Sequence, residues 1–502
     1  MREARTELFD GSRASRAGRL AIGFAMLLAV AYGRIVRAPC DDAYIFYVYA
    51  KNFVQGNGLT YNGTAVQGFT SVVWTALLAL AGLTRVPLPI LGEVLSGASA
   101  CFALWATYRL GRRIGLDRFR AAAPAFLLAL TGDFAFYSAV GLEECLFAGL
   151  VALTVSEALF AKGGRGRGPL PVAILMAATI GTRPEGGLVA ALLFAWMTVR
   201  DRSAGRSLRT GAILAAIVFP AALALRLAYG SWLPNTYYVK SNAGLANFGE
   251  GVDYLLRALP RYAPLVATLA LAGSLRIIRR SAPREKGAAL LFVLAAAWLV
   301  YVAAQGGHNL VGGRVLVPAL PLLYVGLAAL APAARPRPVL AVAALAAALL
   351  VAAYARDDRV QRLAGVWRKN HAILEAAALR LRDEFPPGTK VALNAAGIIP
   401  FYSGLPAIDM LGLNDRHIAR SGRRDRGLRF GHQAGDGAYV LAEKPGVILL
   451  GGTPSDRPGL YVSDQEIWAS SEFHERYDRV DWEGIGTIWV RRQGVDGEEA
   501  GG

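Results

Sequence analysis

The chain has 502 residues, of which 54% are hydrophobic, and it carries a formal net charge of +17. Its mean hydropathy is +0.36, which indicates a polytopic membrane protein and argues against a soluble domain. The arginines gather in short stretches between apolar runs, a pattern of membrane orientation and not of nucleic-acid binding. The three cysteines, Cys40, Cys101 and Cys145, are too few and too scattered for a disulfide framework or a zinc site.

Eleven apolar runs approach the ~20 residues that cross a bilayer. They cover about 20–37, 88–110, 121–140, 145–161, 169–182, 186–199, 210–229, 262–275, 287–304, 313–332 and 338–355. The N-terminus is basic, and alternate connections between the runs are basic as well, namely 111–120, 162–168, 200–209, 276–286 and 335–337. The positive-inside rule therefore places them in the cytoplasm and the other connections outside. Ser71–Leu83 is apolar but too short to span, so we expect a juxtamembrane or re-entrant helix on the outer face.

Residues 356–495 follow the last predicted span and are expected outside the cytoplasmic membrane. An amphipathic pattern predicts a helix over about 357–384, and strand-like runs occur at 390–394, 446–450 and 487–490. This pattern predicts a small α/β domain. The expected organisation is thus a membrane domain over 1–355 with a large outer loop at 38–87, an α/β domain over 356–495, and a disordered tail over 496–502.

Two adjacent carboxylates, Asp41 and Asp42, directly follow the first apolar run. Carboxylates at the mouth of a transmembrane helix are costly unless water solvates them or a function requires them. They therefore mark either a solvated helix end or a general base, with or without a metal ion. The residues that follow, 51–74, are rich in Gly, Asn and aromatic side chains, which is typical of a folded surface loop.

Further charged residues lie near the outer ends of the predicted spans. Glu143 and Glu185 add two carboxylates, and Arg183 has the spacing to pair with Glu185. Arg226 lies inside an apolar run, where an arginine usually faces a polar cavity or an anion, and Lys240 follows soon after. Acids and bases on one membrane face suit a phosphate-bearing substrate and a hydroxyl acceptor. The sequence has no Walker A motif or dinucleotide fingerprint, so a soluble nucleotide donor is not supported.

Several short motifs follow one another along the chain. They are DDAYIFYVYAKNFVQGNGLTYN from Asp41, QGFTSVVW from Gln67, GLE from Gly141, TRPEG from Thr182, PNTYYVK from Pro234, GGRVLVPALP from Gly312 and LGLNDRHIAR from Leu411. As a set they resemble membrane glycosyltransferases of the GT-C superfamily, most closely the bacterial polyprenyl-phosphate-dependent branch that includes mycobacterial arabinofuranosyltransferases. The resemblance covers most of the chain. It implies a polytopic α-helical membrane protein with a C-terminal extracytoplasmic α/β domain.

The resemblance also implies a reaction. Such enzymes transfer a sugar, which is arabinofuranose in the branch named above, from a polyprenyl phosphate to a cell-envelope glycan or other hydroxyl acceptor. The surroundings are membrane lipid, and no nucleic acid is involved. By this resemblance Asp41 or Asp42 deprotonates the acceptor, while Arg226, Lys240 and Arg314 hold the lipid phosphate. Direct displacement of this kind inverts the anomeric centre. No cofactor is certain, and a divalent cation, Mg²⁺ or Ca²⁺, is left open.

The remaining candidate substrate-binding residues lie in the same motifs and are Glu143, Arg183, Glu185, Tyr237, Tyr238 and His308. Two positions depart from the family pattern, since Gln67 stands where Glu is usual and His308 where Asp is usual. These leave the sugar and any metal open, and a lone outward histidine is also consistent with a structural role. Two other classes compete. A secondary transporter would show inverted repeats, and a non-catalytic sugar-binding or assembly protein would have no need of the Asp pair.

Overall fold

The structure is a computed structural model. It describes residues 2–159, 168–201, 204–240, 245–277, 285–308, 310–330, 336–425, 427–428 and 431–492. The predicted disordered tail and most of the basic connections 162–168 and 276–286 lie outside the described residues.

The chain forms two compact units that do not follow chain order. The first, here the helical unit, comprises Met1–Ala38, Gly92–Ala221 and Gly244–Ala364. The second, here the mixed unit, comprises Pro39–Leu91, Ala222–Ala243 and Gly365–Gly502.

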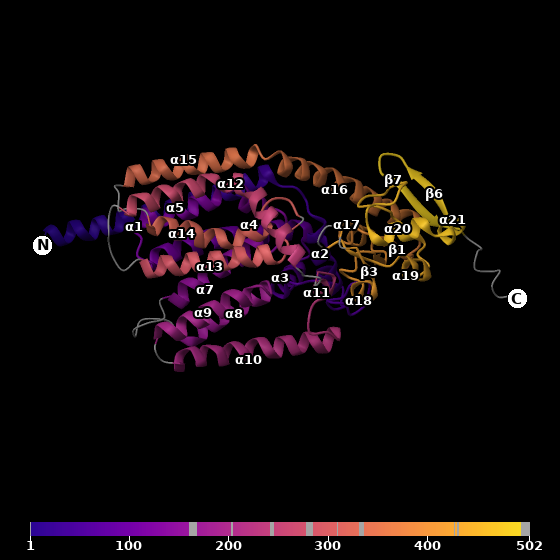
Figure 1. Cartoon of the computed structure of the whole chain (residues 1–502), viewed down its shortest axis with the longest axis horizontal. Coiled ribbons are helices and arrows are strands. Elements are labelled where there is room, and N and C mark those ends of the chain that lie inside the picture. The colour runs from indigo at the N-terminus through magenta and orange to yellow at the C-terminus, as the bar shows by residue number, and fades with distance from the viewer. Residues whose placement is uncertain are drawn as a thin grey trace. The chain divides into compact units, whose positions relative to one another are not determined.

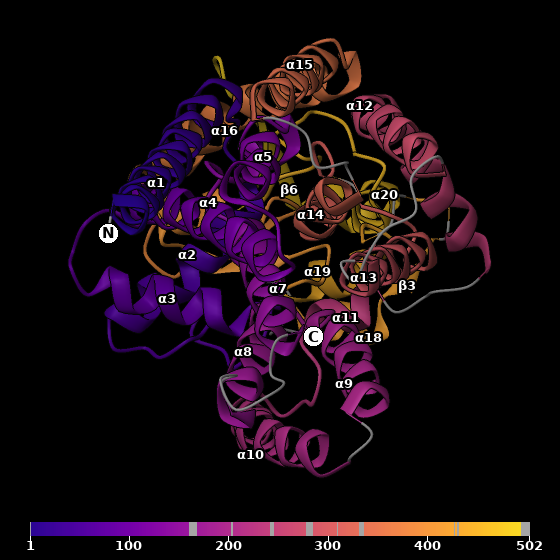
Figure 2. The same cartoon turned by 90° about the vertical axis from the view of Figure 1, so that its left-hand side faces the viewer.

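The helical unit is a bundle of helices that run side by side (Figure 1). Within it α14 packs against α5, α12 and α13, as the end-on view in Figure 2 shows. The helices are α1 (Arg2–Val36), α4 (Leu88–Arg113), α5 (Arg118–Ala129), α6 (Gly132–Tyr137), α7 (Glu144–Leu159), α8 (Pro169–Thr182), α9 (Gly186–Asp201), α10 (Ala204–Tyr229), α12 (Leu245–Ile277), α13 (Glu285–Ala304), the 3-10 helix η1 (Arg314–Ala319), α14 (Leu320–Leu330) and α15 (Pro336–Ala355).

Among the described residues, four helices are long and apolar enough to cross a membrane: Gly18–Val36, Leu88–Arg113, Gly205–Tyr229 and Gly287–Ala304. Shorter apolar helices, such as Val72–Gly82 and Pro169–Thr182, accompany them. In α10 the most apolar stretch of 18 residues is 0% buried, so this helix presents an apolar surface suited to lipid. The chain is a helical membrane protein, while the count of eleven spans and their orientation stay predictions.

The expectation of one continuous span over 121–140 is wrong. α5 ends at Ala129, Thr131 is extended with φ −76° and ψ 118°, and α6 begins at Gly132. A Cβ on Gly132 would lie 2.0 Å from the Tyr354 ring, and the Thr131 hydroxyl bonds the Tyr324 hydroxyl at 2.7 Å. The break thus permits close packing of α6 on α15, which hydropathy does not register.

The mixed unit joins the C-terminal α/β domain to two segments from earlier in the chain. Those segments supply α2 (Asp41–Val54), α3 (Val72–Gly82) and α11 (Asn235–Lys240). The C-terminal part supplies α16 (Asp358–Glu384), α17 (Ile398–Ser403), α18 (Arg416–Ser421), α19 (Gly437–Ala442), α20 (Val462–Ala469), α21 (Ser471–Arg476), β1 (Val391–Leu393), β2 (Ala407–Asp409), β3 (Arg423–Arg424), β4 (Ala434–Gly435), β5 (Val447–Ile448), β6 (Tyr477–Trp482) and β7 (Gly486–Arg491). The predicted amphipathic helix and the three predicted strands are confirmed.

Five of these strands form one sheet in the order β2-β1-β5-β7-β6. β1 runs parallel to both β2 and β5, with Val391 opposite Ala407 and Val447. β7 runs antiparallel to β5 and to β6. The carboxyl ends of the three parallel strands therefore meet at one edge, which is where loops usually carry function in α/β folds.

The outer loop packs on the α/β domain through α2, which contacts α17. Lys51 Nζ donates to the Phe401 carbonyl at 2.7 Å, and the Tyr44 hydroxyl bonds His371 Nε2 at 2.9 Å. Ala407 N donates to the Asn62 side-chain oxygen at 2.9 Å. The sequence assigned this loop to the membrane domain. That functional division stays a prediction, but by contacts the loop belongs to the mixed unit.

Candidate functional site

Asp41, the first residue of α2, is held by the backbone of the turn after β1. Gly397 N donates to its Oδ2 at 3.1 Å, and Ile398 N donates to its Oδ1 at 2.8 Å. Removal of the carboxyl group from water raises the pKa of Asp41 to about 7; the hydrogen bond from Ile398 opposes this rise, and the charge of Asp42 adds to it. A carboxyl group with a pKa near neutrality is suited to accept a proton at physiological pH.

Asp42 is the second residue of α2 and, like Asp41, is half-buried. The helix begins after the buried Cys40, whose backbone is extended and whose side chain makes no cap hydrogen bond. Two acidic residues in a first turn are favoured by the partial positive charge of a helix N-terminus. The predicted pair therefore occupies a folded helix start, and the division of roles within the pair is a matter for the proposals below.

The PNTYYVK motif docks on the α/β domain through Asn235. Asn235 N donates to the Gln67 carbonyl at 2.8 Å. Its side-chain Nδ2 donates to the carbonyls of Gly412 at 2.7 Å and Asp415 at 2.8 Å. The Asn235 side chain thus donates to two carbonyls of the LGLND segment and holds that segment in place. The sequence did not reveal this structural role.

The QGF motif contacts the same LGLND segment. The Tyr49 hydroxyl donates to Asn414 Oδ1 at 3.2 Å and accepts from Gly68 N at 2.9 Å. Asn414 N in turn donates to Asp409 Oδ2 at 2.7 Å. A Cβ on Gly68 would lie 1.9 Å from Asn414 Oδ1, so the position requires glycine. Four motifs, far apart in the sequence, thus build one hydrogen-bonded hub beside β2.

The other predicted residues of the mixed unit differ in their surroundings. The Tyr237 side chain is exposed, whereas the Tyr238 hydroxyl bonds Ser231 Oγ at 3.1 Å and its ring lies 4.7 Å from the Arg420 guanidinium. Lys240 ends α11. Arg226 lies half-buried in the last turn of α10, and within the described ranges its side chain makes no hydrogen bond or ion pair.

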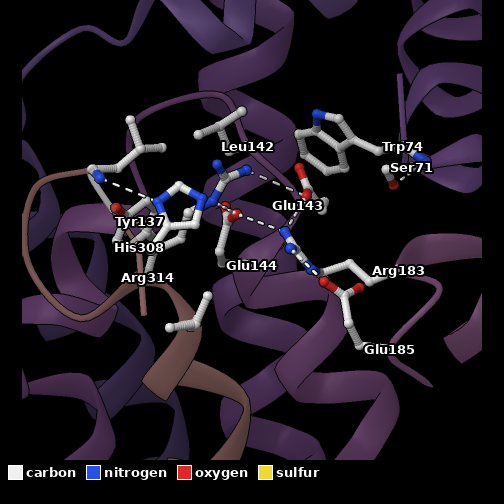
Figure 3. A network of polar contacts seen from close by, with 12 residues as sticks. Ser71, Trp74, Tyr137, Leu142, Glu143, Glu144, Arg183, Glu185, His308 and Arg314 are labelled. Carbon is white, nitrogen blue, oxygen red and sulfur yellow. Dashed lines mark hydrogen bonds and ion pairs between the residues drawn. The ribbon is translucent and has the colours of Figure 1, made fainter. Parts of the chain in front are cut away.

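The helical unit contains a separate network of buried charges, drawn in Figure 3. Arg183 Nη1 contacts Glu143 Oε1 at 2.7 Å and Glu144 Oε1 at 3.4 Å, and its Nη2 contacts Glu185 Oε1 at 3.0 Å. Arg314 Nη2 lies 3.5 Å from Glu143 Oε1, and its Nε contacts Glu144 Oε1. The expected pairing of Arg183 with Glu185 is observed as one part of this larger network.

The network sits between rigid elements. Glu143 directly precedes α7 and Glu144 begins it, Arg183 and Glu185 lie in the turn between α8 and α9, and Arg314 begins η1. The backbone beside Arg314 is fixed because the Tyr137 hydroxyl donates to the Val311 carbonyl and Trp298 Nε1 donates to the Val315 carbonyl, each at 2.6 Å. His308 Nδ1 accepts from Leu310 N at 3.1 Å, so its ring is oriented by its own turn.

Among the described residues, three carboxylates of this network face two guanidinium groups. The side chains of Glu143 and Glu144 are 0% and 2% exposed. Within the described part of the chain, the second oxygen of each has no hydrogen-bond partner. Both arginines are therefore already engaged by carboxylates, and the surplus lies on the negative side.

Sequence analysis did not select a second charged cluster of the helical unit. Arg261 Nε lies 3.3 Å from Asp133 Oδ2, and its Nη1 lies 2.6 Å from Asp357 Oδ2. Positions for a Cβ on Gly312 and Gly313 lie 2.3 and 2.5 Å from the Asp133 oxygens. The GG of the GGR motif thus makes room for Asp133. An acidic residue inside an apolar run was the available signal.

The candidate residues are divided between the two units. The mixed unit holds Asp41, Asp42, Arg226, Tyr237, Tyr238 and Lys240, and the helical unit holds Glu143, Arg183, Glu185, His308 and Arg314. In the described ranges no group of three or more His, Cys, Asp or Glu side chains could hold a metal ion.

Comparison with known proteins places the fold. Residues 358–498 match a family described only as a domain of unknown function, DUF8728, and no curated protein matches the chain. ArnT from Cupriavidus metallidurans, bound to undecaprenyl phosphate, is similar over 78% of this chain and 85% of its own, with a TM-score of 0.59 and 12% identity.

The Archaeoglobus fulgidus oligosaccharyltransferase is a second similar structure. Its apo form aligns over 95% of this chain and 75% of its own, with a TM-score of 0.57 and 12% identity. Its complex with Zn and sulfate aligns over 85% and 67%, with a TM-score of 0.51 and 15% identity. Similarity at such low identity shows the fold alone. It confirms the predicted fold class, a GT-C-like helical membrane protein with a C-terminal α/β domain.

Proposed function

We propose that the chain is an inverting glycosyltransferase that moves a sugar from a polyprenyl phosphate to a hydroxyl acceptor on the extracytoplasmic side of the cytoplasmic membrane. The observation that carries the proposal is the fold shared with an ArnT structure that holds undecaprenyl phosphate. The motif resemblance adds arabinofuranose as the sugar and a cell-envelope glycan as the acceptor. The folded Asp41–Asp42 pair supplies the base.

The reaction needs one base and no protein nucleophile. The acceptor oxygen forms a bond to the anomeric carbon while the bond from that carbon to the phosphate oxygen breaks. The electron pair leaves with the polyprenyl phosphate, and the hydroxyl proton passes to an aspartate of the pair. With its pKa raised to about 7, Asp41 is partly ionised at neutral pH and still basic enough to take this proton.

The leaving phosphate needs cationic partners, and we assign Arg226 as the first of them. Among the described residues its guanidinium makes no hydrogen bond or ion pair. Arg226 lies in the last turn of α10, an apolar helix whose most apolar stretch is not buried. A charge at membrane depth costs ~2.5–3.5 kcal/mol on insertion scales, which an anion offsets. We assign Lys240 as a second cationic partner of the phosphate. Arg314 is already paired with Glu143 and Glu144, so we give it a lesser part.

A divalent cation does not enter the proposed steps. The described residues offer no ligand cluster for one, and both oxygens of Asp41 accept backbone hydrogen bonds.

The test supplies purified protein in nanodiscs with a panel of polyprenyl-phosphate sugars and measures release of polyprenyl phosphate. Wild type should consume one donor in the presence of an acceptor glycan. At least one of Asp41→Asn and Asp42→Asn should lose ~10²-fold or more in turnover, while Asp383→Asn, an exposed carboxylate of α16, should not. Donor binding without cleavage would instead indicate a sugar-binding protein, and movement of an intact substrate across the membrane would indicate a transporter.

A further inference from the structure

The turn after β1 is hydrogen-bonded to the outer loop at three consecutive residues. The Tyr61 hydroxyl donates to the Ala396 carbonyl at 2.8 Å. Gly397 N and Ile398 N donate to the two carboxylate oxygens of Asp41. Tyr61 is fully buried, so this hydroxyl bond is shielded from water and holds the turn in one place.

The fit at this turn requires glycine. A Cβ on Gly397 would lie 2.0 Å from the Asp41 carbonyl oxygen and 3.0 Å from its Oδ1. Gly397 has φ −106°, so the requirement comes from the close approach of Asp41 and not from a left-handed backbone. Any larger residue must push the start of α2 and the turn apart by about 1 Å before ordinary contact distances return.

We propose that the C-terminal α/β domain positions the catalytic base: the Gly397 and Ile398 N–H groups orient Asp41, which takes the acceptor proton, and Asp42 is not the base. This rests on the proposed function. Each Asp41 oxygen accepts one N–H, which leaves each with a second lone pair for the incoming proton. Gly397 and Tyr61 are then positioning residues, because they act on the reaction through Asp41.

The hydrogen bonds also set the pH range in which Asp41 works. The titratable groups near Asp41 are Asp42 on the same helix, Asp409 at the end of β2, and Tyr61. Burial and the acidic neighbours disfavour the ionised form, whereas the two N–H groups stabilise it. Loss of the N–H bonds should therefore raise the pKa of Asp41 and move the acid limb of the kcat/KM profile to higher pH.

The test compares Gly397→Ala with Gly365→Ala. Gly365 meets nothing within 4 Å of its Cβ position, so the control makes the same chemical change in open space. Gly397→Ala should lower kcat by about tenfold to a hundredfold, the scale of a misplacement near 1 Å, with the donor KM unchanged. Its acid limb should move up by about half a pH unit or more. Gly365→Ala should match wild type in all three.

A second pair of variants decides the matter if Gly397→Ala does not fold. Tyr61→Phe removes only the hydroxyl that holds Ala396, and Tyr439→Phe removes a comparable hydroxyl bond, to Asp415 Oδ2, elsewhere in the domain. Tyr61→Phe should lower kcat and raise the acid limb in the same sense, and Tyr439→Phe should do neither. A purely structural role for Tyr61 would lower stability and leave the pH profile in place.

Hydrogen exchange separates this proposal from the proposed function. Amide exchange at Gly397 and Ile398 should speed up in Asp41→Ala and not in Asp42→Ala, whether or not a donor is found. If no donor is cleaved by wild type, the glycosyltransferase proposal fails, and with it the catalytic role given to Asp41. If wild type is active, the positioning proposal is overturned by unchanged exchange in Asp41→Ala, by a folded Gly397→Ala with a wild-type profile, or by full activity of Asp41→Asn.

Discussion

The buried network of Glu143, Glu144, Arg183, Glu185 and Arg314 should respond unequally to loss of positive and of negative charge. Arg314→Met removes one of two guanidinium groups and leaves three carboxylates in the protein interior. Glu143→Gln removes one carboxylate and leaves two carboxylates for two guanidinium groups. The side chain of Arg314 is 8% exposed, so solvent screening offers little relief to the groups it leaves behind.

The size of the effect follows from burial. Removal of one partner of a buried ion pair costs ~3–5 kcal/mol, because an uncompensated charge stays in the interior. We expect Arg314→Met to fall in this range. Glu143→Gln should cost much less, since the amide keeps a hydrogen-bonding oxygen and the charge imbalance disappears. The double variant Arg314→Met, Glu144→Gln should recover part of the loss through the same balance.

The control is Arg34→Met. Arg34 Nη1 contacts Glu93 Oε2 at 2.6 Å, but its side chain is 57% exposed, and exposed pairs contribute only ~0–1 kcal/mol. The assay is unfolding of detergent-solubilised protein by denaturant, with the free energy of unfolding compared across the variants. Two results would refute the reasoning: an Arg314→Met cost no larger than that of Arg34→Met, or a Glu143→Gln cost equal to that of Arg314→Met.

Three further predictions concern lipid binding, orientation and docking. Arg226→Ala should raise the donor KM about tenfold or more with little change in the acceptor KM, and Arg226→Lys should recover only part because lysine lacks the planar fork; a rise in acceptor KM alone would move Arg226 to the acceptor site. A cysteine at Leu460, which is 80% exposed, should react with an impermeant thiol reagent in intact cells and one at Arg112 should not, whereas the reverse pattern would invert the topology. Asn235→Asp should destabilise the mixed unit by ~1–3 kcal/mol, because a carboxylate would replace an amide donor that faces two carbonyls; wild-type unfolding of this variant would contradict the role of Asn235.

The sequence predicted the elements whose signals are local. The helix α16 and the strands β1, β5 and β7 follow from periodicity, and the Arg183–Glu185 pair follows from spacing. The membrane class follows from composition. Each of these signals lies within a few residues of the feature that it predicts, so no knowledge of distant contacts is needed.

The sequence could not reveal the contacts that arrange the candidate sites. Asp41 and Gly397 are separated by 356 positions, and the groups that hold Asp41 are backbone N–H groups, which every residue except proline carries. The network around Arg314 likewise joins residues from three separate turns. Hydropathy identified Glu143 as a charged residue near a span end, and the motif resemblance identified Arg314, but neither signal can tell whether two charges neutralise each other or face a substrate.

The motif hub gives a physical reason for segments that pattern alone assigned to substrate binding. Asn235 is fixed by its hydrogen bond to the Gly412 carbonyl, and Gly68 closely approaches Asn414. A change at any of these residues therefore disturbs the place where α11, the outer loop and β2 meet. A motif can therefore mark packing of the outer loop on the α/β domain as readily as it marks contact with substrate. By this argument the α/β domain, whose residues 358–498 match a family on their own, packs against the outer loop, and the orientation of Asp41 depends on the contacts between them.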